Sequence, residues 1–372
     1  MEKKRYLKIF KSQNDYDAVK KDLMGIPHVV YFEATDELLY VDEEEIDYSK
    51  EYFTIEALED GLTVQLSRNA SEYRIDNGEW IHLATNTATP SINSGQKISF
   101  KITNPTISSS YGIGTFTVNK AFNVEGNIMS LLYGDNFEGQ IDLSGKNNAF
   151  RYLFQNCTTL KNAENLIIPA TILANYCYNY MFSGCTSLIT APQLPATTLA
   201  YACYQYMFYG CTSLTEAPEL PATTLASYCY QYMFYGCTSL TESPELLATT
   251  LADGCYQYMF NGCSKLNYIK MLATYISIRF CLMGWVTGVA SSGTFVKHPD
   301  MTSLPSGTSG IPNGWTVEDD GENVDTTINV EINDSSINFL SNVEITEDSI
   351  SINGENITIQ NDENNNYNII IE

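Results

Sequence analysis

The chain has 372 residues, of which 44% are hydrophobic and 17% charged, so it can bury an extensive core and is not a disordered polymer. Its 44 acidic and 20 basic residues give a net charge of −24, which repels nucleic-acid phosphates and argues against nucleic-acid binding. There is no run of about 18 apolar residues, and the charged start lacks the apolar stretch of a secretory signal. The sequence therefore predicts neither membrane insertion nor export, but synthesis in a reducing cytoplasm.

The charge is distributed unevenly along the chain, and this suggests separately specified parts. Residues 1–60 carry 16 acids and 8 bases, residues 61–317 carry 14 and 12, and residues 318–372 carry 14 acids and no base. With the patterns below, we expect an N-terminal α+β docking domain at 1–50, a β-sandwich cap at 51–125, a repeat region with a closing segment at 126–317, and an acidic β module at 318–372.

At the N-terminus, alternating residues predict strands at Tyr6–Phe10, His28–Glu33 and Glu37–Val41, with a short helix at Asp15–Leu23. The phrase Tyr-Leu-Lys-Ile-Phe…Gly-Ile-Pro-His-Val-Val-Tyr-Phe-Glu…Leu-Leu-Tyr resembles the N-terminal segment of structural proteins of crAss-like phages. The resemblance implies that residues 1–50 dock to capsid or tail proteins of a virion. The alternative is a small capping domain with no role in a particle.

The cap region shows strand patterns with a hairpin signal at Asp76-Asn77-Gly78. The expected strands are 52–57, 62–66, 73–75, 79–83, 97–102 and 115–118, which together predict a small β-sandwich that covers the first repeat.

The middle of the chain contains an internal repeat of 26 residues. One series of cysteines is Cys185, Cys211, Cys237 and Cys263, and a second is Cys177, Cys203, Cys229, Cys255 and Cys281, each spaced by 26 residues. A degraded copy precedes them at Tyr152–Leu160, where the interval from Cys157 to Cys185 is slightly longer than in the later units. Degraded ends around near-identical centres are typical of stacked repeats with capping units.

Within one unit, Leu199, Cys203 and Met207 follow each other at intervals of four, which predicts one face of a short helix after a Thr197-Thr198 cap. Ser213–Ala217 reads as a short strand closed by a proline. A strand, a turn and a short helix in a unit of this length predict one coil of a leucine-rich-repeat solenoid. We therefore expect an α+β multidomain protein built around this solenoid.

The repeated phrase Met-Phe-x-Gly-Cys-x-x-Leu resembles the BspA-like (Treponema-type) leucine-rich repeat. The longer phrase Leu-Pro-Ala-Thr-Thr-Leu-Ala with Cys-Tyr-x-Tyr-Met-Phe is similar to repeat proteins of gut Bacteroides-type bacteria and their phages. The resemblance extends from about Phe53 to about Val317. The resemblance implies a recognition scaffold, and scaffolds of this kind bind many different partners.

The C-terminal segment predicts an antiparallel sheet with one wet face, from strand patterns at 327–332, 337–339, 343–345, 349–359 and 368–372, with a hairpin marked at Ile352-Asn353-Gly354-Glu355. The module is short, so its isoleucine face is expected to need a partner chain, which favours a homo-oligomer.

The ten cysteines all lie between 157 and 281 and lack the close Cys-x2–4-Cys spacing of zinc sites. We interpret them as a ladder of buried free thiols, with disulfides and a metal site as the alternatives.

No cofactor or metal motif is present, and no phosphate-binding loop or serine-nucleophile motif occurs. A pair of glycosidase carboxylates can come from anywhere in a chain, but near-identical repeats argue against a single active site. We therefore expect that the chain is not an enzyme.

Tyrosines recur in register with the cysteines, and such rings suit the binding of sugars or proteins. We expect at least one of the tyrosine columns to be an exposed recognition surface. The alternative is that one of the two columns packs between the coils. The candidate residues are Tyr178, Tyr180, Tyr204, Tyr206, Tyr209, Tyr230, Tyr232, Tyr235, Tyr256 and Tyr258.

Together these features predict a bacteriophage virion appendage, a head fibre or tail-associated fibre, assembled in the host cytoplasm. It would present the solenoid to a glycan or protein of the host surface. The alternatives are a bacterial cell-surface adhesin whose leader has been removed, and a glycan-degrading spike.

Overall fold

The computed structural model describes residues 47–301 and 304–320 with their side chains, and the backbone of three earlier and six later strands. The chain separates into two compact units, Met1–Asp319 and Asp320–Glu372. Among the described residues, none of the helices combines the length and the apolar character that crossing a membrane requires.

The first three strands occur where the sequence predicts them. Strand β1 (Tyr6–Phe10) pairs parallel with β2 (His28–Phe32), which pairs antiparallel with β3 (Glu37–Val41). The helix predicted at Asp15–Leu23 lies outside the described residues.

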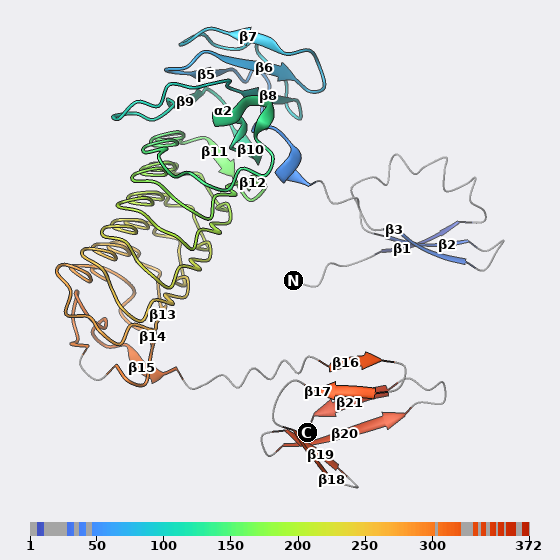
Figure 1. The fold of residues 1–372 in the computed structure, drawn as a ribbon, viewed down its shortest axis with the longest axis vertical. Helices are drawn as coiled ribbons and strands as arrows, with labels where there is room; N and C mark the ends of the chain where they lie inside the picture. Colours follow the sequence, from blue (N-terminus) through green and yellow to red (C-terminus); the bar gives the residue numbers. More distant parts are fainter. Residues whose placement is uncertain are drawn as a thin grey trace. The chain divides into compact units, whose positions relative to one another are not determined.

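The cap consists of a seven-stranded sheet and a two-stranded sheet (Figure 1). The strands are β4 (Thr54–Ala57), β5 (Val64–Leu66), β6 (Ser71–Ile75), β7 (Ile81–Leu83), β8 (Lys97–Lys101), β9 (Phe116–Val118), β10 (Phe122–Asn127), β11 (Leu160–Asn162) and β12 (Leu166–Ile167). The larger sheet has the order β11-β10-β4-β8-β6-β7 with β12 also on β10, and β5 pairs with β9. Phe116 of β9 packs against Phe53 and Phe100, with ring centroids 5.3 and 5.4 Å apart. All three rings are buried, so an aromatic core lies between the two sheets.

The predicted hairpin between β6 and β7 is present. Asp76 adopts a φ of 49°, and Gly78 donates its N–H to the carbonyl of Ile75 at 2.9 Å. The strands on either side pair antiparallel, with Tyr73 opposite Ile81.

Strand β10 joins the cap to the stacked units, and the sequence did not indicate it. One edge of β10 pairs antiparallel with β4, and the other pairs parallel with β11 and β12. The cap also contacts the first unit directly, because the amide of Phe116 donates to the carbonyl of Leu153 at 2.8 Å. The rings of Phe116 and Phe154 stack at 5.7 Å.

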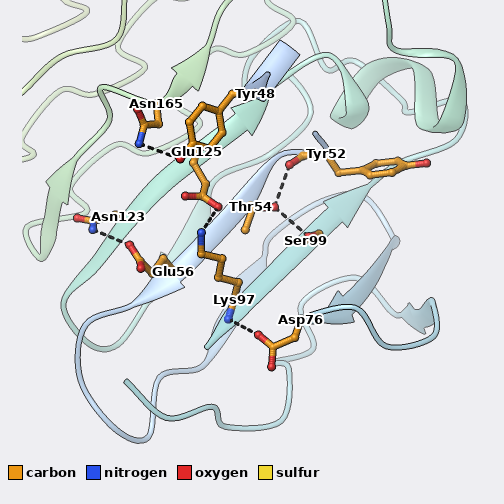
Figure 2. Close-up of polar contacts among 10 residues, drawn as sticks. All are labelled: Tyr48, Tyr52, Thr54, Glu56, Asp76, Lys97, Ser99, Asn123, Glu125 and Asn165. Carbon is orange, nitrogen blue, oxygen red and sulfur yellow. Dashed lines mark hydrogen bonds and ion pairs between the residues drawn. The ribbon is translucent and has the colours of Figure 1, made fainter. Parts of the chain in front are cut away.

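Polar contacts fix the three central strands of this sheet to each other (Figure 2). Lys97 of β8 forms an ion pair with Glu125 of β10 at 2.6 Å, and Asn123 of β10 donates to Glu56 of β4 at 2.8 Å. The short 3-10 helix η2 (Tyr48–Lys50) lies against this region, and Asn165 donates to the Tyr48 hydroxyl at 3.2 Å. Residues 48–50 are therefore part of the cap.

A short helix, α2 (Ser130–Tyr133), and the 3-10 turn η3 (Gly134–Asn136) lead from β10 into the stack. Each following repeat unit then forms one coil that lies directly on the next (Figure 1). The amide of Tyr204 donates to the carbonyl of Cys229 in the next unit at 3.0 Å, and that of Tyr206 donates to Gln231 at 3.0 Å. Equivalent residues of neighbouring coils therefore lie one repeat apart, which is the interval that separates the cysteines in the sequence.

The helix predicted within each unit is wrong, because the segment forms a run of tight turns instead. Alternate amides, such as Gln205 to the carbonyl of Ala202 at 3.3 Å, close turns within the unit, while the amides between them bond the next coil. Every fourth residue has a positive φ: 51° at Ala202, 59° at Tyr206 and 70° at Gly210. An α-helix tolerates neither feature. Ser213–Ala217 also forms no strand in the structure.

The run of turns buries at least two adjacent residues out of every four. In one unit Cys203 and Tyr204, Met207 and Phe208, and then Cys211 are at most 1% exposed. Each stacks on its equivalent in the next unit, as Phe208 does on Phe234 at 5.6 Å with planes 7° apart. One continuous core therefore passes through the stack.

A parallel sheet of β13 (Tyr268–Met271), β14 (Thr294–Lys297) and β15 (Thr316–Asp319) ends the stack. Trp285 is fully buried there and donates its indole N–H to the carbonyl of Gly310 at 2.9 Å.

The strands described in the second compact unit pair antiparallel, as the sequence predicts, and its need for a partner chain remains a prediction. Its strands are β16 (Val330–Asn333), β17 (Ser336–Phe339), β18 (Val343–Thr346), β19 (Ser349–Ile352), β20 (Glu355–Asn361) and β21 (Tyr367–Ile371).

Candidate functional site: a tyrosine ladder

The structure separates the candidate tyrosines into a buried and a half-buried column. Tyr178, Tyr204, Tyr230 and Tyr256 are at most 1% exposed and stack on one another inside the core. These four residues therefore do not belong to a recognition surface, and their inclusion in it was wrong. They follow a cysteine in the inward-facing pair of each turn, and this position points them into the stack.

The buried column carries an energetic cost. The hydroxyl oxygens of Tyr178, Tyr204 and Tyr230 are buried and have no hydrogen-bond partner. Burial raises the pKa of each of these phenols well above its ordinary value. The rings therefore contribute packing, while their hydroxyls lose the hydrogen bonds that water would give them.

The second column is half-buried, and we call Tyr180, Tyr206, Tyr232 and Tyr258 the tyrosine ladder. The ring centroids of successive residues are 4.3, 4.5 and 4.8 Å apart, with interplanar angles of 8°, 7° and 23°.

Tyr209 and Tyr235 flank the ladder. Their rings lie 4.9 Å from each other, and each is 5.7 Å from the ladder tyrosine of its own unit.

Stacking changes what the ladder can offer to a ligand. An isolated tyrosine ring can offer its flat faces to a ligand, but within the ladder those faces are turned toward one another. The ligand-accessible parts are therefore the ring edges and the hydroxyls. Burial, followed by the neighbouring phenols Tyr180 and Tyr232, raises the pKa of Tyr206. The ladder therefore presents a row of neighbouring hydroxyls, each of which can donate and accept a hydrogen bond.

Backbone conformation places the ladder on the rim of the coil. Each ladder tyrosine is one of the positive-φ residues, with φ between 54° and 59°. Gly284 occupies the next equivalent position beyond Tyr258, and also has a positive φ of 62°. A Cβ on Gly284 would lie 2.5 Å from the Tyr258 ring, so this glycine lets the last ring fold onto the backbone and ends the ladder.

The sequence reasoning missed a row of amides beside the ladder. Asn179 donates to the side-chain oxygen of Gln205 at 3.0 Å, Gln205 donates to Gln231, and Gln231 donates to Gln257. These glutamines recur at the same spacing as the tyrosines, so the repeat itself was a signal that could have found them.

Two further tyrosines extend the aromatic row toward the cap. The Tyr152 ring lies 5.1 Å from Tyr180 and 6.1 Å from Tyr111. The guanidinium of Arg151 lies 4.8 Å above the Tyr152 ring, and that of Arg68 lies 4.0 Å above the Tyr111 ring. The interval from Tyr152 to Tyr180 is longer than the regular repeat, and this difference hid Tyr152 in the sequence.

All ten cysteines are free and buried, in register from unit to unit. The thiol of Cys211 donates to the carbonyl of Phe182 at 3.2 Å, and that of Cys237 donates to Phe208 at the same distance. Burial raises the thiol pKa, to about 12 at Cys203, so the reactive thiolate is disfavoured. Across residues 47–301 and 304–320, no group of three or more His, Cys, Asp or Glu side chains is placed to hold a metal ion.

No protein-family model, curated protein or solved structure matches the chain. Function is therefore inferred from the geometry of the ladder and from the sequence patterns.

Proposed function

We propose that this chain is a non-enzymatic recognition protein of a bacteriophage particle, a head fibre or tail-associated fibre. In this proposal the stacked units form a BspA-like leucine-rich-repeat solenoid that contacts the host cell surface. Residues 1–46, the part of the predicted docking segment that lies before the cap, attach the chain to capsid or tail proteins, and the C-terminal module joins copies into a homo-oligomer.

The observation that carries the recognition role is the tyrosine ladder. Four units place the same phenol on the same rim, with neighbouring centroids 4.3 to 4.8 Å apart. Half-buried tyrosines combine a rigid ring with a polar tip, and such residues are enriched at recognition surfaces. Core packing alone does not require them there, since the stack already has an inner column at Tyr204 and its equivalents.

The assignment to a virion is supported by the N-terminal segment, whose order of residues resembles that of crAss-like phage structural proteins. The second candidate is a bacterial surface adhesin, which the repeat resemblance favours equally. Neighbouring genes for capsid and portal proteins support the first candidate, and neighbouring export genes support the second.

The proposal is tested by deleting residues 1–46, which leaves η2 and the rest of the cap intact. The truncated chain is expected to remain folded, to bind host cells and to be absent from assembled particles. The matched variant carries Tyr206→Ala and Tyr232→Ala in the full chain, and it is expected to enter particles normally. The proposal fails if the truncated chain enters particles while the tyrosine variant does not, because the stack would then be the docking element.

A further inference from the structure

The ladder repeats one set of groups at a fixed interval, and this regularity bears on the kind of ligand. Each of three consecutive units places a tyrosine and a glutamine side by side, at Tyr206, Tyr232 and Tyr258 and at Gln205, Gln231 and Gln257. A folded protein partner presents a surface that does not repeat at this interval. A polymer of identical units does, and it engages successive rungs with increasing avidity.

The chemistry of the rungs restricts the ligand further. The segments that carry the ladder, 176–184, 201–210, 228–236 and 254–262, contain no acidic or basic residue, although the chain has a net charge of −24. The half-buried tyrosines and glutamines of the rungs carry neutral donors and acceptors, namely phenol hydroxyls and carboxamides. A charged polymer would find no counter-charge along these segments, whereas a neutral polymer rich in hydroxyls would find hydrogen-bond partners at every rung.

Building on the function proposed above, we infer that the tyrosine ladder binds a neutral polysaccharide lying along the stack. Its hydroxyls bond to the row of phenol tips and to the amides of Gln205, Gln231 and Gln257. Because the ring faces stack on one another, hydrogen bonds at the ring edges provide the recognition. Binding therefore strengthens with the number of sugar units and is insensitive to salt.

The test uses the purified full chain and two sets of soluble probes. The neutral probes are mannan, galactomannan, dextran and arabinoxylan, and the acidic probes are polygalacturonate and alginate. We expect retardation in gels containing a neutral probe, tighter binding by longer fragments, and no change between about 50 and about 500 mM NaCl. Tyr206→Ala with Tyr232→Ala should weaken binding about tenfold or more. The control Thr224→Ala with Thr250→Ala changes exposed residues in the units of Tyr232 and Tyr258 and should bind like the wild type.

Host cells provide the deciding arm. Mild periodate treatment of the cells should abolish adsorption of the wild-type chain, and protease treatment should leave it unchanged. The reverse pattern overturns the inference and leaves the recognition role standing, with a protein as receptor. The inference is also overturned if the chain binds only the acidic probes and salt weakens that binding. It is overturned as well if the wild-type chain is a dimer that the tyrosine substitutions dissociate, because the ladder would then be an interface between copies. Failure of the wild-type chain to adsorb to untreated cells contradicts the proposed function itself.

Discussion

The phenol ring of Tyr206 lies parallel to that of Tyr232, with centroids 4.5 Å apart and planes 7° from each other. Two positions away, Tyr204 stacks on Tyr230 in the same manner but is buried, with centroids 5.9 Å apart. The same repeat thus builds a packing column and a surface column from one type of residue, and substitutions can distinguish the two.

Removing the hydroxyl of Tyr204 should stabilise the fold. This hydroxyl is buried without a partner, so Tyr204→Phe removes an unsatisfied polar group and should raise the free energy of unfolding by about 1 kcal/mol. Tyr206→Phe is the matched control, since its hydroxyl belongs to a half-buried side chain at the rim and its removal should change stability little. Urea unfolding midpoints measure both. A loss of stability in the Tyr204 variant would mean that the Tyr204 hydroxyl is hydrogen-bonded.

The glycine at the end of the ladder should be sensitive to substitution. Gly284→Ala places a Cβ 2.5 Å from the Tyr258 ring, whereas Gly210→Ala meets no atom within 4 Å at a similar φ of 70°. The Gly284 variant should therefore lose about 1–2 kcal/mol more stability than the Gly210 variant. Thermal unfolding of the two proteins measures the difference, and indistinguishable curves would refute the close contact at Tyr258.

Stability should fall at alkaline pH. Burial raises the pKa of the cysteine thiols and of the inner tyrosines, so the folded chain holds their protonated forms. The stabilisation is complete below the unfolded pKa values, about 8.5 for Cys and about 10 for Tyr, and is lost as the pH rises through the folded values. The free energy of unfolding should be level to about pH 8 and then fall by about 1.4 kcal/mol per pH unit for each thiol that stays protonated. Urea titrations at successive pH values measure this slope, and constant stability from pH 8 to pH 10 would contradict it.

The thiols should be unreactive in the native protein. All ten are buried, so a thiol reagent should label few of them before denaturation and all ten afterwards. Mass spectrometry of the labelled chain counts the modified sites. Rapid native labelling of most cysteines would contradict the stacked core, and release of zinc on unfolding would instead indicate a metal site.

Much of the fold was readable from the sequence because its signals are periodic. Alternation placed strands near β4 to β9, and the cysteine spacing gave the register between units. Strand β10 was missed because Phe122–Asn127 contains a glycine and two asparagines, which are poor strand formers. The turns were mistaken for helix because Leu199, Cys203 and Met207 recur every four residues, a spacing that fits both structures over two turns.

The site was less accessible to sequence reasoning. Tyr204 and Tyr206 both recur at the same interval, so the repeat alone does not say which is buried. Tyrosine rarely adopts a positive φ, so the conformation of Tyr206 could not be predicted from its residue type. The available signal was the adjacency of Tyr204 to Cys203, since the structure buries pairs of neighbours in every group of four.

The most direct test of the account is adsorption of the purified full chain to host cells. The wild type is compared with Tyr206→Ala and Tyr232→Ala, which change the ladder, and with Tyr204→Phe, which changes only the buried column. Circular dichroism confirms that each protein is folded. We predict that the ladder variant loses about tenfold or more in affinity while the Tyr204 variant binds like the wild type. Unchanged adsorption of a folded ladder variant would contradict the claim that this surface recognises the host.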